Sequence, residues 1–312
     1  MPPAKLKPSE IAAEAKKTYI PYIRQNYNTQ WPAQSFLCHS ESLAAGPAQI
    51  TRHCRFAFFD RDPVDVALDW APTEDVPIPV IMPANDKRPG GDWEAGVMAP
   101  EECLCRRSNL YSAMTTVAEG NSVPSNYPIP SKAGIFSEKV VVFRSGPEKY
   151  ELWTEFKALP VISVCPVKRP KLDSSGKKYS FKQEKELMRD SIRTSLRIAI
   201  YYGYYNLCIG NFGLGPGFRN PPEEVATMWK DAFLKDPEFR GHFQDIVFAF
   251  EFSEGSNSAS SSKGSSSKSS KSSSSKSSTS SSSSPSSSSS SDLDTFRHVF
   301  KPAVIHDAFK AR

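Results

Sequence analysis

The stretch PGGDWEAGVMAPEECLCRRS, residues Pro89–Ser108, places a glycine turn shortly before two adjacent glutamates at an expected helix start. Glycine lets backbone approach a ligand closely. Pro100 suits the first position of a helix, because its missing N–H would be unpaired there anyway. The apolar run Val76–Met82 leads into the turn and is typical of a strand. A strand, a glycine turn and a helix start in this order predict a ligand loop at the carboxyl edge of a sheet.

A second glycine loop follows another buried-type strand, Asn206–Ile209, and precedes a helix that begins at Pro222. It contains Gly210, Gly213, Gly215 and Gly217. Two such loops at one sheet edge form a cradle for a diphosphate, because backbone N–H groups and helix N-termini bind anions.

The rest of the chain alternates between strand and helix patterns. Further strands are predicted at residues 55–59, 139–143, 159–165 and 245–250, and helices at 11–21, 100–114 and 181–202. The last helix is expected to turn Leu187, Ile192, Leu196 and Ala199 inward, and the helix at 100–114 to align Leu104, Ser108, Tyr111 and Met114. This alternation predicts an α/β fold, a three-layer α/β/α sandwich with a mixed, largely parallel central sheet.

Composition divides the 312 residues into four parts. Residues 253–291 are almost entirely Ser with scattered Lys, which offers little apolar area to offset chain entropy, so this insertion is expected to be disordered. Residues 1–54 are predicted to be a helical extension packed on the domain, 55–252 the core, and 292–312 a C-terminal element of the same domain.

Several function classes are disfavoured by the sequence. The net charge of +5 is dispersed, without a basic helix or interleaved aromatics, so direct DNA binding is not expected. The N-terminus lacks a secretory signal and no run is long enough to span a bilayer, which predicts a cytoplasmic or nuclear protein without membrane attachment. The six cysteines and five histidines show no spacing typical of disulfides or metal ligands. The oligomeric state cannot be read from the sequence.

Four segments, in order and with matching spacing, resemble the microbial-type poly(ADP-ribose) glycohydrolases of the macrodomain superfamily. They are residues 81–91, 101–111, 210–226 and 246–250. The resemblance implies a macrodomain-like fold and an ADP-ribosyl glycohydrolase that hydrolyses the ribosyl O-glycosidic bond of poly- or mono-ADP-ribose on modified proteins. It implies no metal and no cofactor.

The resemblance also implies roles for individual residues. Glu102 would be the general acid and then the base for water, while Glu101 would hold the ribose hydroxyls beside the scissile bond. The expected ligand contacts are Asn85, Gly90, Gly91, Asp92, Gly213, Gly215, Gly217, Phe218 and Arg219. Asn85 could equally form a turn, and Phe218 could equally be a core aromatic.

Three positions depart from the family pattern. Asp92 stands where the family has a third glycine, Pro100 where it has glutamine, and Arg219 where it usually has glycine. Asp92 would bring a carboxylate close to the diphosphate, where like charges repel unless a cation intervenes. The alternative function is therefore a macrodomain that binds ADP-ribose without cleaving it. A third hypothesis makes Asp92 the cation ligand of a metal-assisted hydrolase.

Overall fold

A computed structural model describes residues 6–48, 52–251 and 291–302. The predicted Ser-rich insertion lies outside the described residues, apart from Ser291. None of the helices within these ranges is long and apolar enough to cross a membrane.

Seven strands form one mixed sheet in the order β1-β4-β5-β3-β6-β7-β2. They are β1 (Phe36–His39), β2 (Arg55–Phe59), β3 (Val80–Pro83), β4 (Ala133–Arg144), β5 (Leu152–Val164), β6 (Leu207–Ile209) and β7 (Asp245–Ala249). Strands β5, β3, β6, β7 and β2 run parallel, while β4 is antiparallel to both β1 and β5. The predicted fold class, with its mixed and largely parallel sheet, is confirmed.

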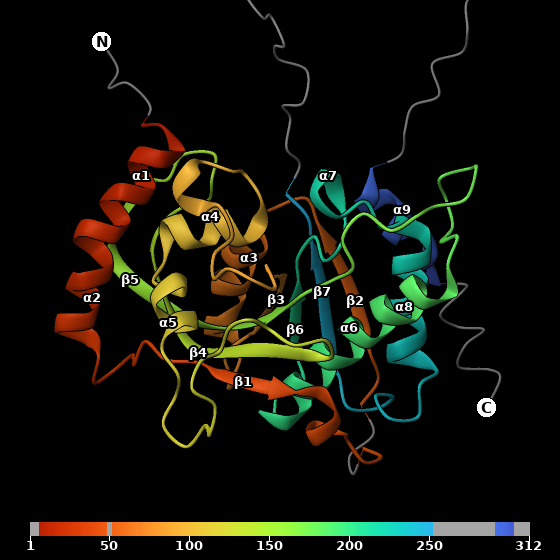
Figure 1. Ribbon diagram of the computed structural model, residues 1–312. Helices are drawn as coiled ribbons and strands as arrows, with labels where there is room; N and C mark the ends of the chain where they lie inside the picture. Colours follow the sequence, from red (N-terminus) through yellow and green to blue (C-terminus); the bar gives the residue numbers. More distant parts are fainter. Residues whose placement is uncertain (1–5, 49–51, 252–290, 303–312) are drawn as a thin grey trace, which may run out of the picture.

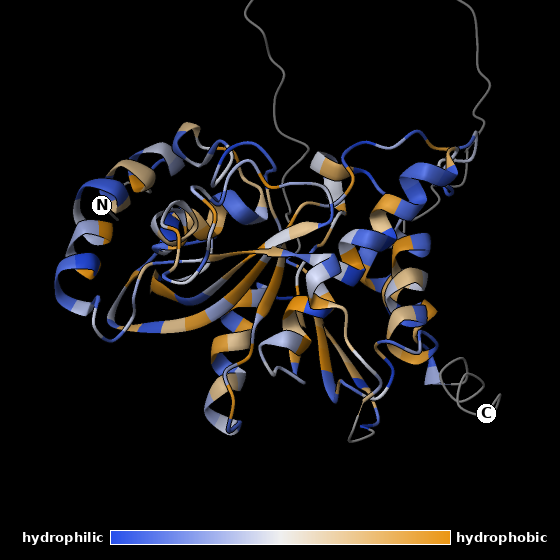
Figure 2. Ribbon diagram, turned by 60° about the horizontal axis from the view of Figure 1, so that its bottom comes forward, coloured by the Kyte–Doolittle hydropathy of each residue, from blue (hydrophilic) through white to orange (hydrophobic). Residues whose placement is uncertain are grey.

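Two helical layers enclose the sheet (Figure 1). One contains α1 (Pro8–Glu14), α2 (Ile20–Tyr27), α3 (Pro63–Trp70), α4 (Pro100–Arg107) and α5 (Leu110–Thr115). The other contains α6 (Lys182–Tyr201), α8 (Pro222–Leu234) and α9 (Asp292–Val299), and the short α7 (Gly215–Phe218) follows β6. Each layer packs its own hydrophobic cluster against the sheet, and Figure 2 shows hydrophobic residues concentrated along the strands.

The N-terminal helix is longer than the sequence predicted. It was expected to end at Pro21, but it continues to Tyr27 through a π turn at Ala15–Tyr19. The π turn widens the hydrogen-bond ladder just before the proline ring, which would otherwise clash with the preceding turn. Residues 1–54 also contain β1, so this part of the chain contributes a strand to the sheet as well as helices.

The helix predicted at 100–114 is two helices. Ser108 is extended and its backbone pairs with Val142 of β4. Its hydroxyl donates to the carbonyl of Leu104 and accepts from the N–H of Leu110, which gives a partner to one backbone group at each helix end. Pairing with the sheet therefore overrides the helical pattern here.

Leu187 was expected to face the core but is 44% exposed. Met188 is fully buried in its place, together with Ile192, Leu196 and Ala199. The inward stripe of α6 therefore starts one residue later than predicted, at the spacing that places residues on one helix face.

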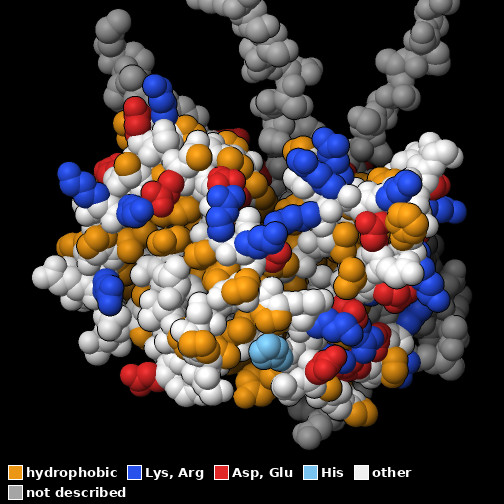
Figure 3. Space-filling model, viewed as in Figure 1, with side chains coloured by type: hydrophobic (Ala, Val, Ile, Leu, Met, Phe, Trp, Pro, Cys, Tyr) orange, Lys and Arg blue, Asp and Glu red, His pale blue; other side chains and the backbone are white. Residues whose placement is uncertain are grey.

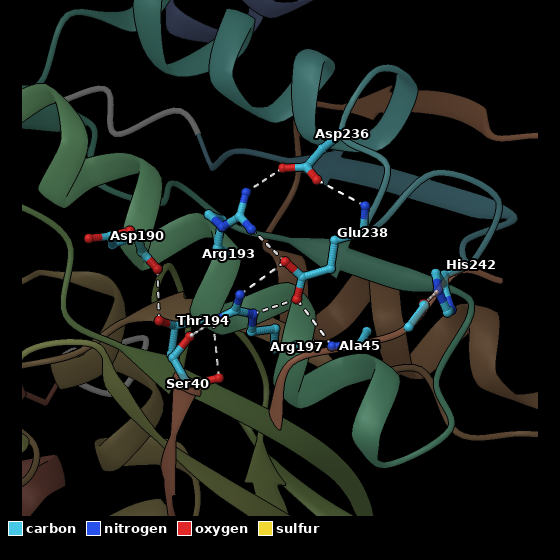
Figure 4. A network of polar contacts seen from close by, with 10 residues as sticks. Ser40, Ala45, Asp190, Arg193, Thr194, Arg197, Asp236, Glu238 and His242 are labelled. Carbon is cyan, nitrogen blue, oxygen red and sulfur yellow. Dashed lines mark hydrogen bonds and ion pairs between the residues drawn. The ribbon is translucent and has the colours of Figure 1, made fainter. Parts of the chain in front are cut away.

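A polar network fastens α6 to two connecting segments (Figure 4). Arg197 donates to Glu238 at 2.6 Å and to the carbonyl of Ser40 at 3.1 Å. Glu238 also accepts from the N–H of Ala45, and Arg193 pairs with Asp236. The network lies among α6 and the segments that follow β1 and α8, away from both glycine loops.

Candidate functional site

Glu101 is buried behind the first glycine loop and binds both ends of it. Glu101 is the second residue of α4 and is only 4% exposed. One carboxylate oxygen accepts from the N–H of Asn85 at 2.6 Å, and the other from the N–H of Gly90 at 2.9 Å. Glu101 therefore braces the loop Asn85–Gly90. The role predicted for it with the ribose hydroxyls stays a prediction.

Burial raises the pKa of Glu101 to about 8, and the nearby charge of Glu102 acts in the same direction. The two backbone N–H groups act against this rise, because they favour the ionised carboxylate. Adjacent carboxyl groups in different environments can hold different protonation states, which is the arrangement that acid–base chemistry requires.

This raised pKa predicts a pH-dependent stability. The folded protein keeps a proton on Glu101 that the unfolded chain releases near 4.5, so stability is lost as the pH rises between 4.5 and about 8. Neutral glutamine mimics the protonated form. The free energy of unfolding of the parent, relative to Glu101→Gln, should therefore be largest at about pH 4 and below, and should shrink as the pH rises towards 8. Chemical unfolding at fixed salt measures this difference, and a constant difference would contradict the assignment.

Glu102 is half-buried and lies against the glycine turn. Its Oε1 accepts from the N–H of Asp92 at 3.3 Å. A Cβ at Gly91 would collide with that same oxygen, and Gly91 has a φ of 55°, which a side chain disfavours. Gly91 is therefore required for Glu102 to occupy its position beside the turn.

Asn85 forms a turn. Its side-chain oxygen accepts from the N–H groups of Lys87 and Arg88, at 2.9 and 3.0 Å. This is the turn-forming alternative raised from the sequence. The amide nitrogen is directed towards Gly91, with 3.7 Å between it and the position of a Cβ there.

Two ion pairs lie at the first loop. Asp92 pairs with Arg88 at 2.9 Å, and Asp86 pairs with Lys168 at 3.5 Å. Figure 3 shows Lys and Arg side chains along the same face, between α4 and α7. Asp92 thus has a cationic partner, and positive charge borders the loop where an anionic ligand would enter.

The second glycine loop is held by buried Asn220, whose amide donates to the carbonyls of Gly213 and Val167 at 2.7 Å each. Gly213 and Gly215 have positive φ values, and a Cβ at Gly213 would lie 2.7 Å from Met188. Gly217 faces open space. Both Gly213 and Gly215 are therefore required by backbone conformation.

The structure brings the two loops to one sheet edge, as predicted. They follow β3 and β6, which are neighbours in the sheet. Phe218 is half-buried beneath Lys168, whose Nζ lies 5.9 Å from the ring centroid. Arg219 is exposed with a φ of 59°, and it donates to the carbonyl of Pro216 in its own loop.

Sequence reasoning missed Lys168 and Asn220 as parts of the site. Lys168 follows β5 and lies between Asp86 of the first loop and Phe218 of the second. In the sequence, Lys168 belongs to a short basic cluster with Arg169 and Lys171, a composition typical of a solvated loop. The sequence shows that Lys168 follows a predicted strand. It does not show that this strand, β5, pairs with β3 in the sheet. Asn220 carried no signal apart from its place after the glycines.

No group of three or more His, Cys, Asp or Glu side chains suited to a metal ion occurs within residues 6–48, 52–251 and 291–302. The described site contains a pair of carboxyl groups, buried Glu101 and half-buried Glu102. They lie beside two glycine loops and the cationic side chains of Arg88 and Lys168. Such a set can bind a diphosphate and can transfer a proton to an adjacent acetal oxygen.

Comparisons with known proteins agree with the fold. Residues 9–145 match the family described as microbial-type PARG, catalytic domain. A similar solved structure is poly(ADP-ribose) glycohydrolase (PARG) from Thermomonospora curvata, with 22% identity, a TM-score of 0.64, and coverage of 78% of this chain and 92% of that one. The same enzyme bound to the inhibitor ADP-HPD shows 22% identity, a TM-score of 0.63, and coverage of 80% and 95%.

A second similar enzyme is the poly(ADP-ribose) glycohydrolase of Deinococcus radiodurans in complex with ADP-ribose. It has 20% identity and a TM-score of 0.55, over 75% of this chain and 91% of that one. No curated protein matches the sequence.

Proposed function

We propose that this chain, whose residues 9–145 match microbial-type PARG, catalytic domain, is an ADP-ribosyl glycohydrolase that releases ADP-ribose from poly- or mono-ADP-ribosylated proteins. The observation that carries this proposal is the half-buried carboxyl group of Glu102. It lies against Gly91 and next to buried Glu101, at the sheet edge where both glycine loops meet.

Glu102 is the proton donor in this proposal. As the bond between the ribose carbon and the leaving oxygen breaks, its electron pair goes to that oxygen, which takes the proton of Glu102. The ribosyl group passes through an oxocarbenium-like transition state. The Glu102 carboxylate then accepts a proton from the attacking water, and free ADP-ribose results.

Glu101 and the loops position the substrate for this step. Glu101 keeps Gly90 and Asn85 in place through their N–H groups. The glycine loops offer close backbone approach to the diphosphate, and Lys168 and Arg88 supply positive charge beside them. Binding of ADP-ribose by the Deinococcus radiodurans relative supports this ligand.

The direct test is ADP-ribose release from poly-ADP-ribosylated protein by the full chain, with ADP-ribose binding measured in parallel by calorimetry. Release supports the glycohydrolase. Binding without release would identify a non-catalytic reader and overturn the proposal. If the chain neither binds nor releases ADP-ribose, its similarity to the family extends to the fold alone.

Asp92 is predicted to weaken ADP-ribose binding. It brings a carboxylate close to the expected diphosphate and pairs with Arg88, which could otherwise face the ligand. Asp92→Asn should tighten the Kd for ADP-ribose by roughly 3- to 10-fold at low salt, the size expected of one partly screened charge contact. The gain should shrink at high salt.

A matched control for this substitution is Glu94→Gln. Glu94 is an exposed acid of the same loop, but it pairs with Lys16 of the N-terminal helix. Calorimetry should show an unchanged Kd for Glu94→Gln. Equal effects of the two substitutions, or weaker binding by Asp92→Asn, would contradict the local role of Asp92.

A further inference from the structure

Arg106 is a fully buried cation with an unusual set of partners. It occupies the last turn of α4 beside Arg107, and both are buried in the core. Arg107 binds two carboxylates, Asp62 and Asp65. Arg106 forms no ion pair with any carboxylate of the described residues, and its hydrogen bonds go to neutral groups. A buried charge without an anion is costly, so packing alone does not account for an arginine here.

The guanidinium of Arg106 connects two points of one loop. Its Nε donates to the carbonyl of Trp93 at 2.9 Å, and its Nη2 donates to the carbonyl of Val97. Between these residues the chain makes a 3-10 turn at Trp93–Ala95 and then a left-handed turn at Gly96. One side chain therefore fixes the loop Trp93–Val97 at both ends.

The third nitrogen, Nη1, points into a pocket of weakly polar atoms. It lies 3.5 Å from the hydroxyl of Tyr150, 3.5 Å from the sulfur of Met98 and 3.9 Å from that of Cys103. None of these groups is an anion, so the carbonyls of Trp93 and Val97 are the strongest acceptors available to Arg106. The strongest hydrogen bonds of the guanidinium therefore go to the loop Trp93–Val97.

The loop that Arg106 holds continues directly into the contact with Glu102. Trp93 is buried and its N–H donates to the carbonyl of Gly90 at 3.2 Å. The preceding N–H, that of Asp92, donates to Glu102. Glu102 and Arg106 are four residues apart on α4, so both reach the same side of that helix. A shift of the Trp93 carbonyl would move the N–H group that orients the Glu102 carboxyl.

We propose that Arg106 is a positioning residue for the glycosidic step: it holds the loop Trp93–Val97 so that the Asp92 N–H orients the carboxyl group of Glu102. This inference rests on the proposed glycohydrolase function. Arg106 acts through the loop and does not touch the substrate. Its loss should lower kcat more than it weakens ligand binding, because Gly90 of the first glycine loop is held separately by Glu101.

The test compares Arg106→Met and Arg106→Lys with the parent, using Arg197→Met as the control. Arg197 also donates to a backbone carbonyl and to Glu238, but it belongs to α6 and lies in the network of Figure 4. Four quantities are measured: kcat and KM for ADP-ribose release from poly-ADP-ribosylated protein, the Kd for ADP-ribose, and amide hydrogen exchange at Asp92–Val97.

For Arg106→Met we expect kcat to fall by about 10- to 100-fold, the size of effect produced by a misplacement of about 1 Å. The Kd for ADP-ribose should change by less than about threefold, and exchange should accelerate at Asp92–Val97. Arg106→Lys should be intermediate, because an ammonium group can reach only one carbonyl at a time with good geometry. Arg197→Met should lose stability and keep its kcat.

Two results would overturn the inference. One is a parent-like kcat with parent-like exchange at Asp92–Val97 in either Arg106 variant, and Arg106→Lys serves here if Arg106→Met does not fold. The other is an equal fall of kcat in Arg197→Met. If the parent itself releases no ADP-ribose, the proposed function fails. The exchange of Asp92–Val97 in the Arg106 variants then still decides whether Arg106 holds the loop.

Discussion

Glu102→Gln should reduce the rate of ADP-ribose release by about 10²- to 10⁴-fold, the range contributed by a positioned general acid or base. Glutamine keeps the size of the side chain and an oxygen that can accept from the Asp92 N–H, which Glu102 accepts at 3.3 Å. It cannot give a proton to the leaving oxygen. The Kd for ADP-ribose should stay close to that of the parent, and calorimetry with a steady-state assay measures both.

A suitable control is Glu223→Gln. Glu223 also follows a proline in the first turn of its helix, α8, and it is exposed. In that position a carboxylate favours the helix N-terminus without any further role. Glu223→Gln should keep full activity. A Glu102→Gln protein that retains a tenth or more of the parent rate would remove Glu102 from the role of proton donor.

The glycine loops were predictable because their signals are local. A strand, glycines and a helix-starting proline are adjacent in the sequence at Val80–Pro100, and again at Leu207–Pro222. The order of strands in the sheet is not local. Only the placement of β3 between β5 and β6 brings Lys168 next to both loops. That arrangement depends on tertiary packing, which periodicity does not encode.

The adjacent glutamates illustrate a signal that was present but incomplete. Successive helix residues are rotated by about 100°, so Glu101 and Glu102 must face different surroundings. Leu104 and Cys105, three and four residues after Glu101, are buried and share its face. The same spacing places buried Cys105 and Arg106 on the face of Glu102, so the helical pattern did not distinguish buried Glu101 from half-buried Glu102. It did not contain the contacts with the N–H groups of Asn85 and Gly90, because these come from a separate loop.

The two incorrect helix boundaries have different causes. The break at Ser108 follows from the pairing of its backbone with Val142. A helical pattern in the sequence does not predict this pairing. The helix through Pro21 depends on the π turn before it. The sheet therefore decides the break at Ser108, whereas a local change in helix geometry allows the helix to continue past Pro21.

Arg107→Met should destabilise the protein by about 3–5 kcal/mol, the cost of removing one partner from an ion pair whose cation is buried. The Arg107 side chain is 1% exposed, and it binds Asp62 and Asp65 at the start of α3. Asp62 also caps α3 by accepting from the N–H groups of Val64 and Asp65. Loss of the cation therefore leaves two like charges together at a helix cap. Urea unfolding, followed by circular dichroism, measures the change.

The double variant Arg107→Met/Asp65→Asn separates a buried ion pair from a simple packing defect. Removing the charge of Asp65 as well should recover part of the lost stability, because only Asp62 then remains ionised beside the helix start. Additive losses would mean that Arg107 stabilises the protein through its volume alone. Because Arg107 joins the end of α4 to the start of α3, coupling between Arg107 and Asp65 would show that charge fixes the helix that carries Glu101 and Glu102 at its other end.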